Sequence, residues 1–161
     1  MKLASLLLAM AALAAAQTAH APVPGPYRAD ANAHKDLAAA QARARAGHKY
    51  VFVIFGANWC EDCRVLHRSL ESPEVRAYVE SHFEIVGVDI GDDGKKNADV
   101  ARSLGVSLAK GVPAAAILNP DGTTLGRTNN GELEPSRTYQ PKQILHFLEG
   151  IVEHQQITKP A

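Results

Sequence analysis

Two kinds of hydrophobic pattern alternate along the chain, and together they predict a mixed α/β fold. Continuous apolar runs rich in β-branched and aromatic residues are typical of buried strands, whereas apolar positions three or four apart indicate helices. The apolar runs predict strands over 49–55, 83–90, 114–118 and 123–126. Helical spacing and helix-forming composition predict helices over 31–46, 60–70 and 97–104, and from Pro73 and Pro141 onward.

The order of these elements predicts the sheet. A strand-helix-strand crossover in the first half pairs its strands in parallel, whereas the later hairpin, with its turn at Asn119-Pro120-Asp121-Gly122, adds antiparallel strands. We therefore expect a central mixed β-sheet flanked by helices on both faces.

The N-terminal residues predict export. Lys2 precedes an Ala/Leu-rich apolar run, and Ala14 and Ala16 supply an A-x-A cleavage pattern. We predict a signal peptide over 1–16, with a later cut at 21 as the alternative, and a mature protein that is periplasmic or secreted. The alternative is a buried Ala-rich helix. By composition, we expect a Pro-rich linker over 17–30, a folded domain over 31–156 and a tail over 157–161.

Charge is balanced, with 17 acidic and 17 basic residues and no basic stripe along the sequence. Net charge therefore gives no electrostatic reason to expect nucleic acid or an anionic membrane as a partner. Nothing in the sequence points to an oligomer, so we expect a monomer that needs no cofactor.

The only two cysteines, Cys60 and Cys63, lie where a strand pattern gives way to a helical one. A helix N-terminus stabilises a thiolate through its free N–H groups and dipole, so Cys60 is the predicted nucleophile. Cys63, one turn on, can resolve a mixed disulfide. So short a loop gains little stability from a cross-link, which favours a redox-active pair over a structural one.

The residues between the cysteines, Glu61 and Asp62, predict the direction of the chemistry. Their negative charges disfavour a thiolate at Cys60 and oppose the helix dipole, so we expect a stable disulfide and a reducing protein. Alternatively, they are ordinary acids in a first helical turn, where the dipole favours them.

His67 gives a second interpretation of the same region. It lies four residues after Cys63, so Cys60, Cys63 and His67 share a helix face and could bind zinc or copper. No fourth ligand is offered nearby in the sequence, and we therefore predict no metal and keep a metal-handling module as the alternative.

With these features in place, residues 35–153 resemble the thioredoxin superfamily. The resemblance lies in Trp59-Cys60-Glu61-Asp62-Cys63, in the strand Val86-Gly87-Val88-Asp89, and in Gly111-Val112-Pro113-Ala114, which is similar to the family's cis-proline segment. The chain is also similar to the periplasmic C-terminal domains of transmembrane thiol:disulfide interchange proteins. The resemblance implies that Pro113 is cis and that Val112 pairs with substrate through its backbone; the alternative is a trans proline in a surface loop. Trp59 offers a flat apolar contact for a substrate peptide, and the alternative is a plain core tryptophan.

The resemblance implies a thiol:disulfide oxidoreductase that acts on protein disulfides, and we expect a reductase supplied by a membrane or soluble thiol donor. The alternative functions are a dithiol oxidase and a binding scaffold. Two departures bear on this. Glu61-Asp62 replaces the Gly-Pro of thioredoxins, and Ile54 stands where they bury an aspartate. Residues 128–140 have no counterpart to which a role can be assigned.

Overall fold

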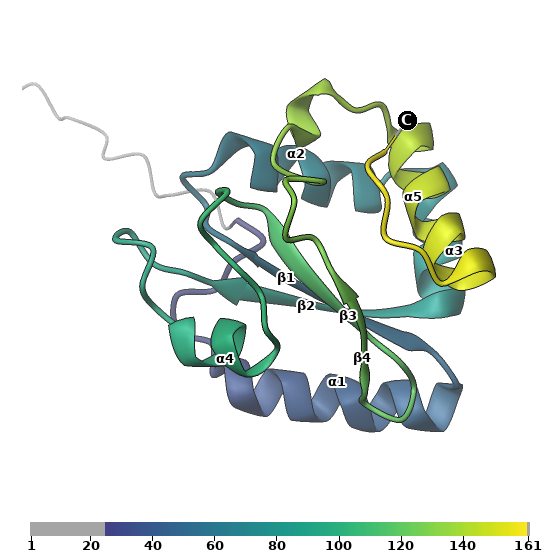
Figure 1. Ribbon diagram of the computed structural model, residues 1–161, viewed down its shortest axis with the longest axis horizontal. Coiled ribbons are helices and arrows are strands. Elements are labelled where there is room, and N and C mark those ends of the chain that lie inside the picture. Colours follow the sequence, from purple (N-terminus) through teal and green to yellow (C-terminus); the bar gives the residue numbers. More distant parts are fainter. Residues whose placement is uncertain (1–24, 161) are drawn as a thin grey trace, which may run out of the picture.

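A four-stranded sheet forms the centre of the computed structural model, which describes residues 25–160 (Figure 1). The strands are β1 (Tyr50–Gly56), β2 (Phe83–Asp89), β3 (Ala114–Leu118) and β4 (Thr124–Arg127). Their order is β2-β1-β3-β4, with β2 parallel to β1 and β3 antiparallel to both β1 and β4. The predicted mixed sheet is confirmed. The predicted signal peptide over 1–16, and the alternative cut at 21, lie outside the described residues.

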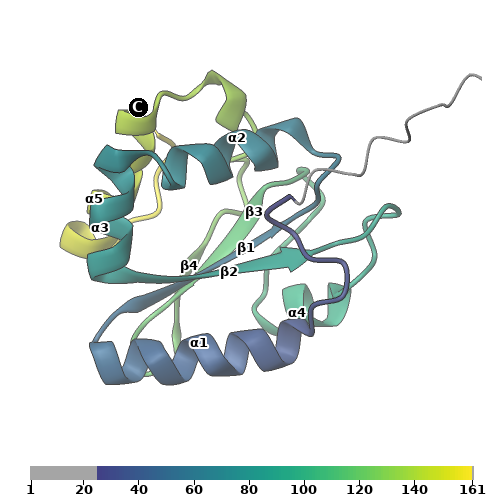
Figure 2. The same ribbon diagram turned by 180° about the vertical axis from the view of Figure 1, so that it is seen from behind.

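Helices cover both faces of the sheet, as predicted (Figures 1 and 2). One face carries α1 (Ala33–Gly47) and α4 (Ala98–Ser103), and the other carries α2 (Glu61–Leu70), α3 (Pro73–His82) and α5 (Pro141–His154). A short 3-10 turn, η1 (Ser136–Thr138), precedes α5. Within residues 25–160, every helix is too short or too polar to cross a membrane.

The central strand β1 explains the two cores. Successive side chains of a strand point to opposite faces. Val51, Val53 and Phe55 therefore pack toward α1 and α4, whereas Phe52 and Ile54 pack toward α2, α3 and α5. All five are buried, each contributing about 1.5–3 kcal/mol of hydrophobic stabilisation. Strand β1 is thus a firm base for the turn that leads into α2.

Helix α1 ends one residue later than its sequence suggests. Gly47 was the expected stop, but it is the last helical residue, and His48 takes the left-handed conformation at φ 53°. Histidine is one of the polar residues that tolerate this region, and its N–H closes the helix on Ala44 O.

Two residues outside the predicted domain, 31–156, also pack against the fold. In the segment expected to be a linker, Tyr27 is buried and its N–H bonds to Asn58 Oδ1 at 3.1 Å. In the segment expected to be a tail, Ile157 packs against Gly126 of β4. Composition marked these segments as polar or Pro-rich, but single apolar side chains anchor them.

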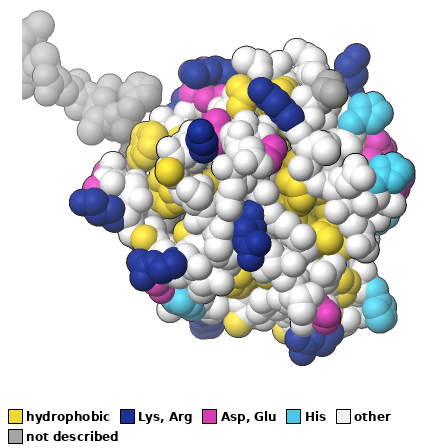
Figure 3. Space-filling view, viewed as in Figure 1, with side chains coloured by type: hydrophobic (Ala, Val, Ile, Leu, Met, Phe, Trp, Pro, Cys, Tyr) yellow, Lys and Arg dark blue, Asp and Glu magenta, His cyan; other side chains and the backbone are white. Residues whose placement is uncertain are grey.

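Charged side chains are scattered over the face seen in Figure 3. Lysine and arginine side chains are not gathered there into one stripe.

Candidate functional site

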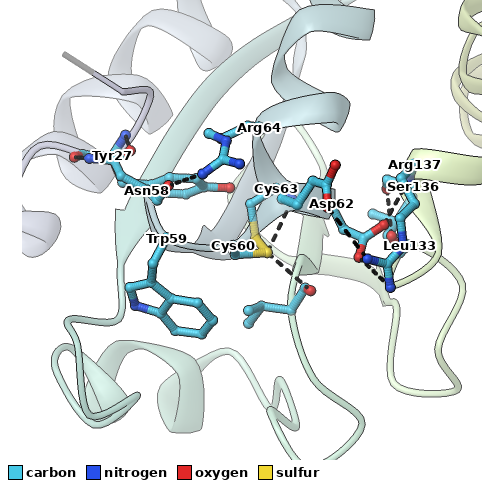
Figure 4. Close-up of a disulfide and its surroundings, with 12 residues drawn as sticks. Tyr27, Asn58, Trp59, Cys60, Asp62, Cys63, Arg64, Leu133, Ser136 and Arg137 are labelled. Atoms are coloured by element: carbon cyan, nitrogen blue, oxygen red, sulfur yellow. Dashed lines mark hydrogen bonds and ion pairs between the residues drawn. A yellow bond between two sulfur atoms is a disulfide. The ribbon is translucent and has the colours of Figure 1, made fainter. Parts of the chain in front are cut away.

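Cys60 and Cys63 form a disulfide at the start of α2 (Figure 4). Cys60 is the N-cap of the helix, and the Cys63 N–H donates to Cys60 Sγ at 3.1 Å. The sequence places the first sulfur there because the β1 strand ends at Gly56 and a short turn, 57–59, leads directly into the helix. In the reduced state the same N–H and the helix dipole stabilise a Cys60 thiolate.

The two sulfurs differ in burial, in the predicted order. Cys60 is 7% exposed and Cys63 is fully buried. Trp59, the residue before the pair, is 54% exposed, and its Nε1 donates to Gly91 O at 3.1 Å. Trp59 is therefore not a core residue. Its indole is held on the surface beside the cysteine that reaches solvent.

The loop before β3 completes the site. The Val112–Pro113 peptide bond is cis, as the resemblance implied. Cys60 Sγ lies 3.4 Å from Val112 O, so residues 52 positions apart in the sequence meet at the disulfide. The predicted residues Trp59, Cys60, Val112 and Pro113 are thus brought to one end of the sheet.

The acidic residues between the cysteines are engaged by the segment that the sequence left without a role. Asp62 is buried, and its Oδ1 accepts a hydrogen bond from the Arg137 N–H at 2.8 Å. The Arg137 guanidinium lies 3.5 Å from Asp62 Oδ2 and 3.6 Å from Glu61 Oε2. Figure 4 shows Arg137 reaching Asp62 from η1. Residues 128–140 therefore secure the first turn of α2 and oppose its negative charge.

This contact leads to a prediction for Arg137→Ala. Without the guanidinium, the charges of Glu61 and Asp62 act unopposed on Cys60, and we expect the pKa of the Cys60 thiol to rise. The rise should be small, because Arg137 and Glu61 are exposed to solvent. Thiolate absorbance of the reduced protein measures it. Arg76→Ala, which breaks an exposed pair with Glu80 on α3, is the control. An unchanged or lower midpoint would contradict the prediction.

A residue near the second sulfur was missed by sequence reasoning. Tyr27 packs with Cys60 and Cys63 in a small buried cluster, and in Figure 4 its ring extends toward the base of α2. Burial, together with the negative charge of Asp89, raises the pKa of the Tyr27 hydroxyl well above its usual value of 10. The only signal in the sequence was one aromatic residue in a Pro-rich stretch.

Ile54 stands where the family resemblance implies a buried aspartate. It is buried in the core under α2, among apolar neighbours such as Leu66 and Leu70. An acid at this position would lose its hydration without gaining a partner there, so the apolar residue suits the packing.

The loop beside the cis proline carries an unusual acid. Both carboxylate oxygens of Glu134 are buried, with no hydrogen-bond partner among the described residues. The side chain lies against Gly111 and Gly131. Desolvation raises the pKa of Glu134 above its usual 4.5. Glu134 therefore keeps its proton to a higher pH than an exposed glutamate would.

The alternative metal site is not supported. His67 Nε2 pairs with Glu71 Oε1 at 3.3 Å, one turn along α2. Across residues 25–160, no three His, Cys, Asp or Glu side chains gather closely enough to hold a metal ion. Cys60 and Cys63 are instead bonded to each other.

The fold and the disulfide define a thioredoxin-like protein with a Cys-x-x-Cys redox centre. The model of the family described as "Thioredoxin-like" matches residues 32–120, more than half of the chain. The chain is also 34% identical to a disulphide isomerase from Xylella fastidiosa Temecula1, covering 81% of this chain and 99% of that one, with a TM-score of 0.78. This chain therefore belongs to the thioredoxin-like family.

A second solved structure shares the fold at lower identity. It is a thioredoxin-fold protein from Helicobacter pylori, 24% identical over 70% of this chain and 74% of that one, with a TM-score of 0.50. No curated protein sequence matches the chain.

Proposed function

We propose that this protein is an exported thiol:disulfide oxidoreductase that reduces disulfides in protein substrates through Cys60 and Cys63. The observation that carries the proposal is the disulfide itself. It caps a helix N-terminus, and Cys60 is slightly exposed at 7% whereas Cys63 is fully buried. That asymmetry gives one sulfur for attack and one for resolution.

The proposed reaction proceeds in two exchanges. The Cys60 thiolate attacks one sulfur of a substrate disulfide, and the other substrate sulfur leaves with the bond's electron pair and takes a proton from water. Cys63 then gives its proton to water and attacks Cys60 Sγ, which releases the second substrate sulfur. Two electrons pass to the substrate, and the Cys60–Cys63 disulfide remains. A membrane or soluble thiol donor must then reduce it.

The surface around Cys60 suits an extended peptide. Val112 lies against Cys60 Sγ and can offer its backbone to a substrate strand, as the family resemblance implies, while Pro113 holds the loop beside it. A cavity of about 380 Å³ opens beside the turn that leads into α2, with Trp59, Asn58 and Lys96 among its lining residues. The exposed indole of Trp59 supplies a flat apolar contact.

The acids at Glu61 and Asp62 support the reducing direction, because they disfavour the Cys60 thiolate and so favour the disulfide. Arg137 moderates this effect without removing it, since two carboxylates face one guanidinium. The A-x-A pattern ending at Ala16 supports export to the periplasm or outside the cell.

An insulin-reduction assay with dithiothreitol as donor tests the proposed activity. We expect faster precipitation of the insulin B chain than with dithiothreitol alone, and none of this acceleration with Cys60→Ser. Faster oxidation of reduced substrate, without reductase activity, would favour the dithiol oxidase. Metal in freshly purified reduced protein, with no activity in either assay, would favour the metal-handling alternative.

A further inference from the structure

The side chains of Tyr27 and Cys63 both lie close to Gly56. A Cβ built on Gly56, the last residue of β1, would lie within 3.0 Å of both Tyr27 Oη and Cys63 Sγ. The phenol and the buried sulfur therefore share the space that the missing side chain leaves. Tyr27 is only 4% exposed, so this placement is set by packing and is not a surface encounter.

Among the described residues, no acceptor is paired with the hydroxyl of Tyr27. Both hydrogen bonds of Tyr27 use its backbone, with the N–H donating to Asn58 Oδ1 and the carbonyl accepting from Asn58 Nδ2. Within residues 25–160 the Oη–H therefore has no hydrogen-bond partner. Its raised pKa keeps it protonated throughout the physiological range, so it can donate a hydrogen bond but cannot act as a base.

We propose that the Tyr27 hydroxyl donates a hydrogen bond to the Cys63 thiolate and so assists the step that resolves the mixed disulfide. This inference rests on the proposed function. In that step Cys63 gives its proton to water, and the thiolate attacks Cys60 Sγ. The bond from Cys60 to the substrate sulfur breaks, and that sulfur leaves with the electron pair. Tyr27 exchanges neither its proton nor electrons, and stabilises the charged sulfur before it attacks.

Tyr27 can assist the deprotonation of Cys63, which the apolar side chain of Ile54 cannot do. A fully buried thiol deprotonates reluctantly, because burial disfavours the charged form. A neutral donor lowers that cost without placing a second negative charge beside the thiolate. Both predicted cleavage sites lie before Tyr27, so the mature chain retains it.

Other titratable or charged groups surround the pair and must be separated from Tyr27 in any pH profile. Asp89 of β2 faces the phenol and is paired with Lys96 at 2.8 Å, and His67 of α2 lines the same cavity as Tyr27. Asp92 lines the neighbouring cavity, and Arg64 lies near the start of α2.

The test uses Tyr27→Phe and the small aromatic disulfide 5,5′-dithiobis(2-nitrobenzoate) in stopped flow. Reduced protein releases one thionitrobenzoate when Cys60 attacks and a second when Cys63 resolves the adduct. We expect the second phase of Tyr27→Phe to slow about tenfold at pH 7, and its pH midpoint to rise by about one unit. The first phase should change little.

Two control variants separate this role from plain packing. Tyr139→Phe removes another buried hydroxyl, bonded to Glu132 O at 2.9 Å, and His67→Gln removes the titratable neighbour. Both should keep the wild-type midpoint of the second phase. A Tyr27→Phe midpoint equal to wild type, or the same rise with His67→Gln, would overturn the inference. If wild-type protein releases no thionitrobenzoate at all, the proposed function fails instead.

If Tyr27→Phe does not fold, the hydrogen bond can be tested in a protein that keeps Tyr27. In Cys60→Ser protein, the ¹³Cζ signal of Tyr27 should shift with pH at the midpoint of the Cys63 ¹³Cβ signal, because the phenol responds to the thiolate that it binds. A Tyr27 signal that stays constant while Cys63 titrates would contradict the hydrogen bond.

Discussion

Cys63→Ser protein is expected to accumulate covalent adducts through Cys60, while insulin reduction falls to the rate of dithiothreitol alone. Cys60 keeps its helix N-terminus and its place beside Val112, so it still attacks. The buried serine hydroxyl cannot replace the thiolate, because its proton is far too weakly acidic at neutral pH. The adduct then persists until an external thiol reduces it.

Non-reducing electrophoresis of Cys63→Ser protein mixed with disulfide-containing proteins measures this trap. The adducts should disappear with reductant. The matched control is Cys60→Ser, in which the remaining sulfur is fully buried and should form almost none. Equal adduct formation by the two variants would mean that the structure's assignment of the attacking sulfur is wrong.

Gly56→Ala is expected to destabilise the protein and to impair the site together. The new methyl group would meet Tyr27 Oη, Tyr27 Cζ and Cys63 Sγ closer than atoms normally approach. Overpacking a well-filled interior costs about 1–3 kcal/mol, and here either the phenol or the sulfur must move. We therefore expect a lower free energy of unfolding and slower resolution of mixed disulfides.

Urea denaturation of the oxidised protein measures the first effect. Gly150→Ala is the control, because a Cβ there meets nothing closer than 3.9 Å within α5, and alanine favours a helix by about 0.5–1 kcal/mol. The control should be as stable as the wild type or slightly more so. A Gly56→Ala variant of unchanged stability would show that the space over Gly56 is not filled as described.

Much of the fold was predictable because its signals are local. The unbroken apolar run of β1 indicated a strand buried on both faces, and its two cores follow from simple alternation. The cysteine pair was predicted at a helix N-terminus because the strand pattern stops just before it. Asp121-Gly122 correctly marked the turn between β3 and β4.

The rest of the site depends on contacts between distant segments, which local patterns do not encode. Arg137 reaches Asp62 across 75 residues, and no spacing rule connects a 3-10 turn to the first turn of a remote helix. Tyr27 was hidden in a Pro-rich stretch and becomes informative only once Gly56 places it beside Cys63. The Arg137 contact also weakens the expected effect of Glu61 and Asp62, because it places beside them a cation that no sequence pattern indicated.

A redox titration of the Cys60–Cys63 pair in thiol–disulfide buffers tests the central claim most directly, with the free thiols alkylated and counted at each potential. The account predicts one reversible two-electron transition close to the thioredoxin value of about −270 mV. A transition near about −120 mV, typical of a strong oxidant, would contradict the reducing role. A pair that never interconverts between dithiol and disulfide would contradict the proposed chemistry altogether.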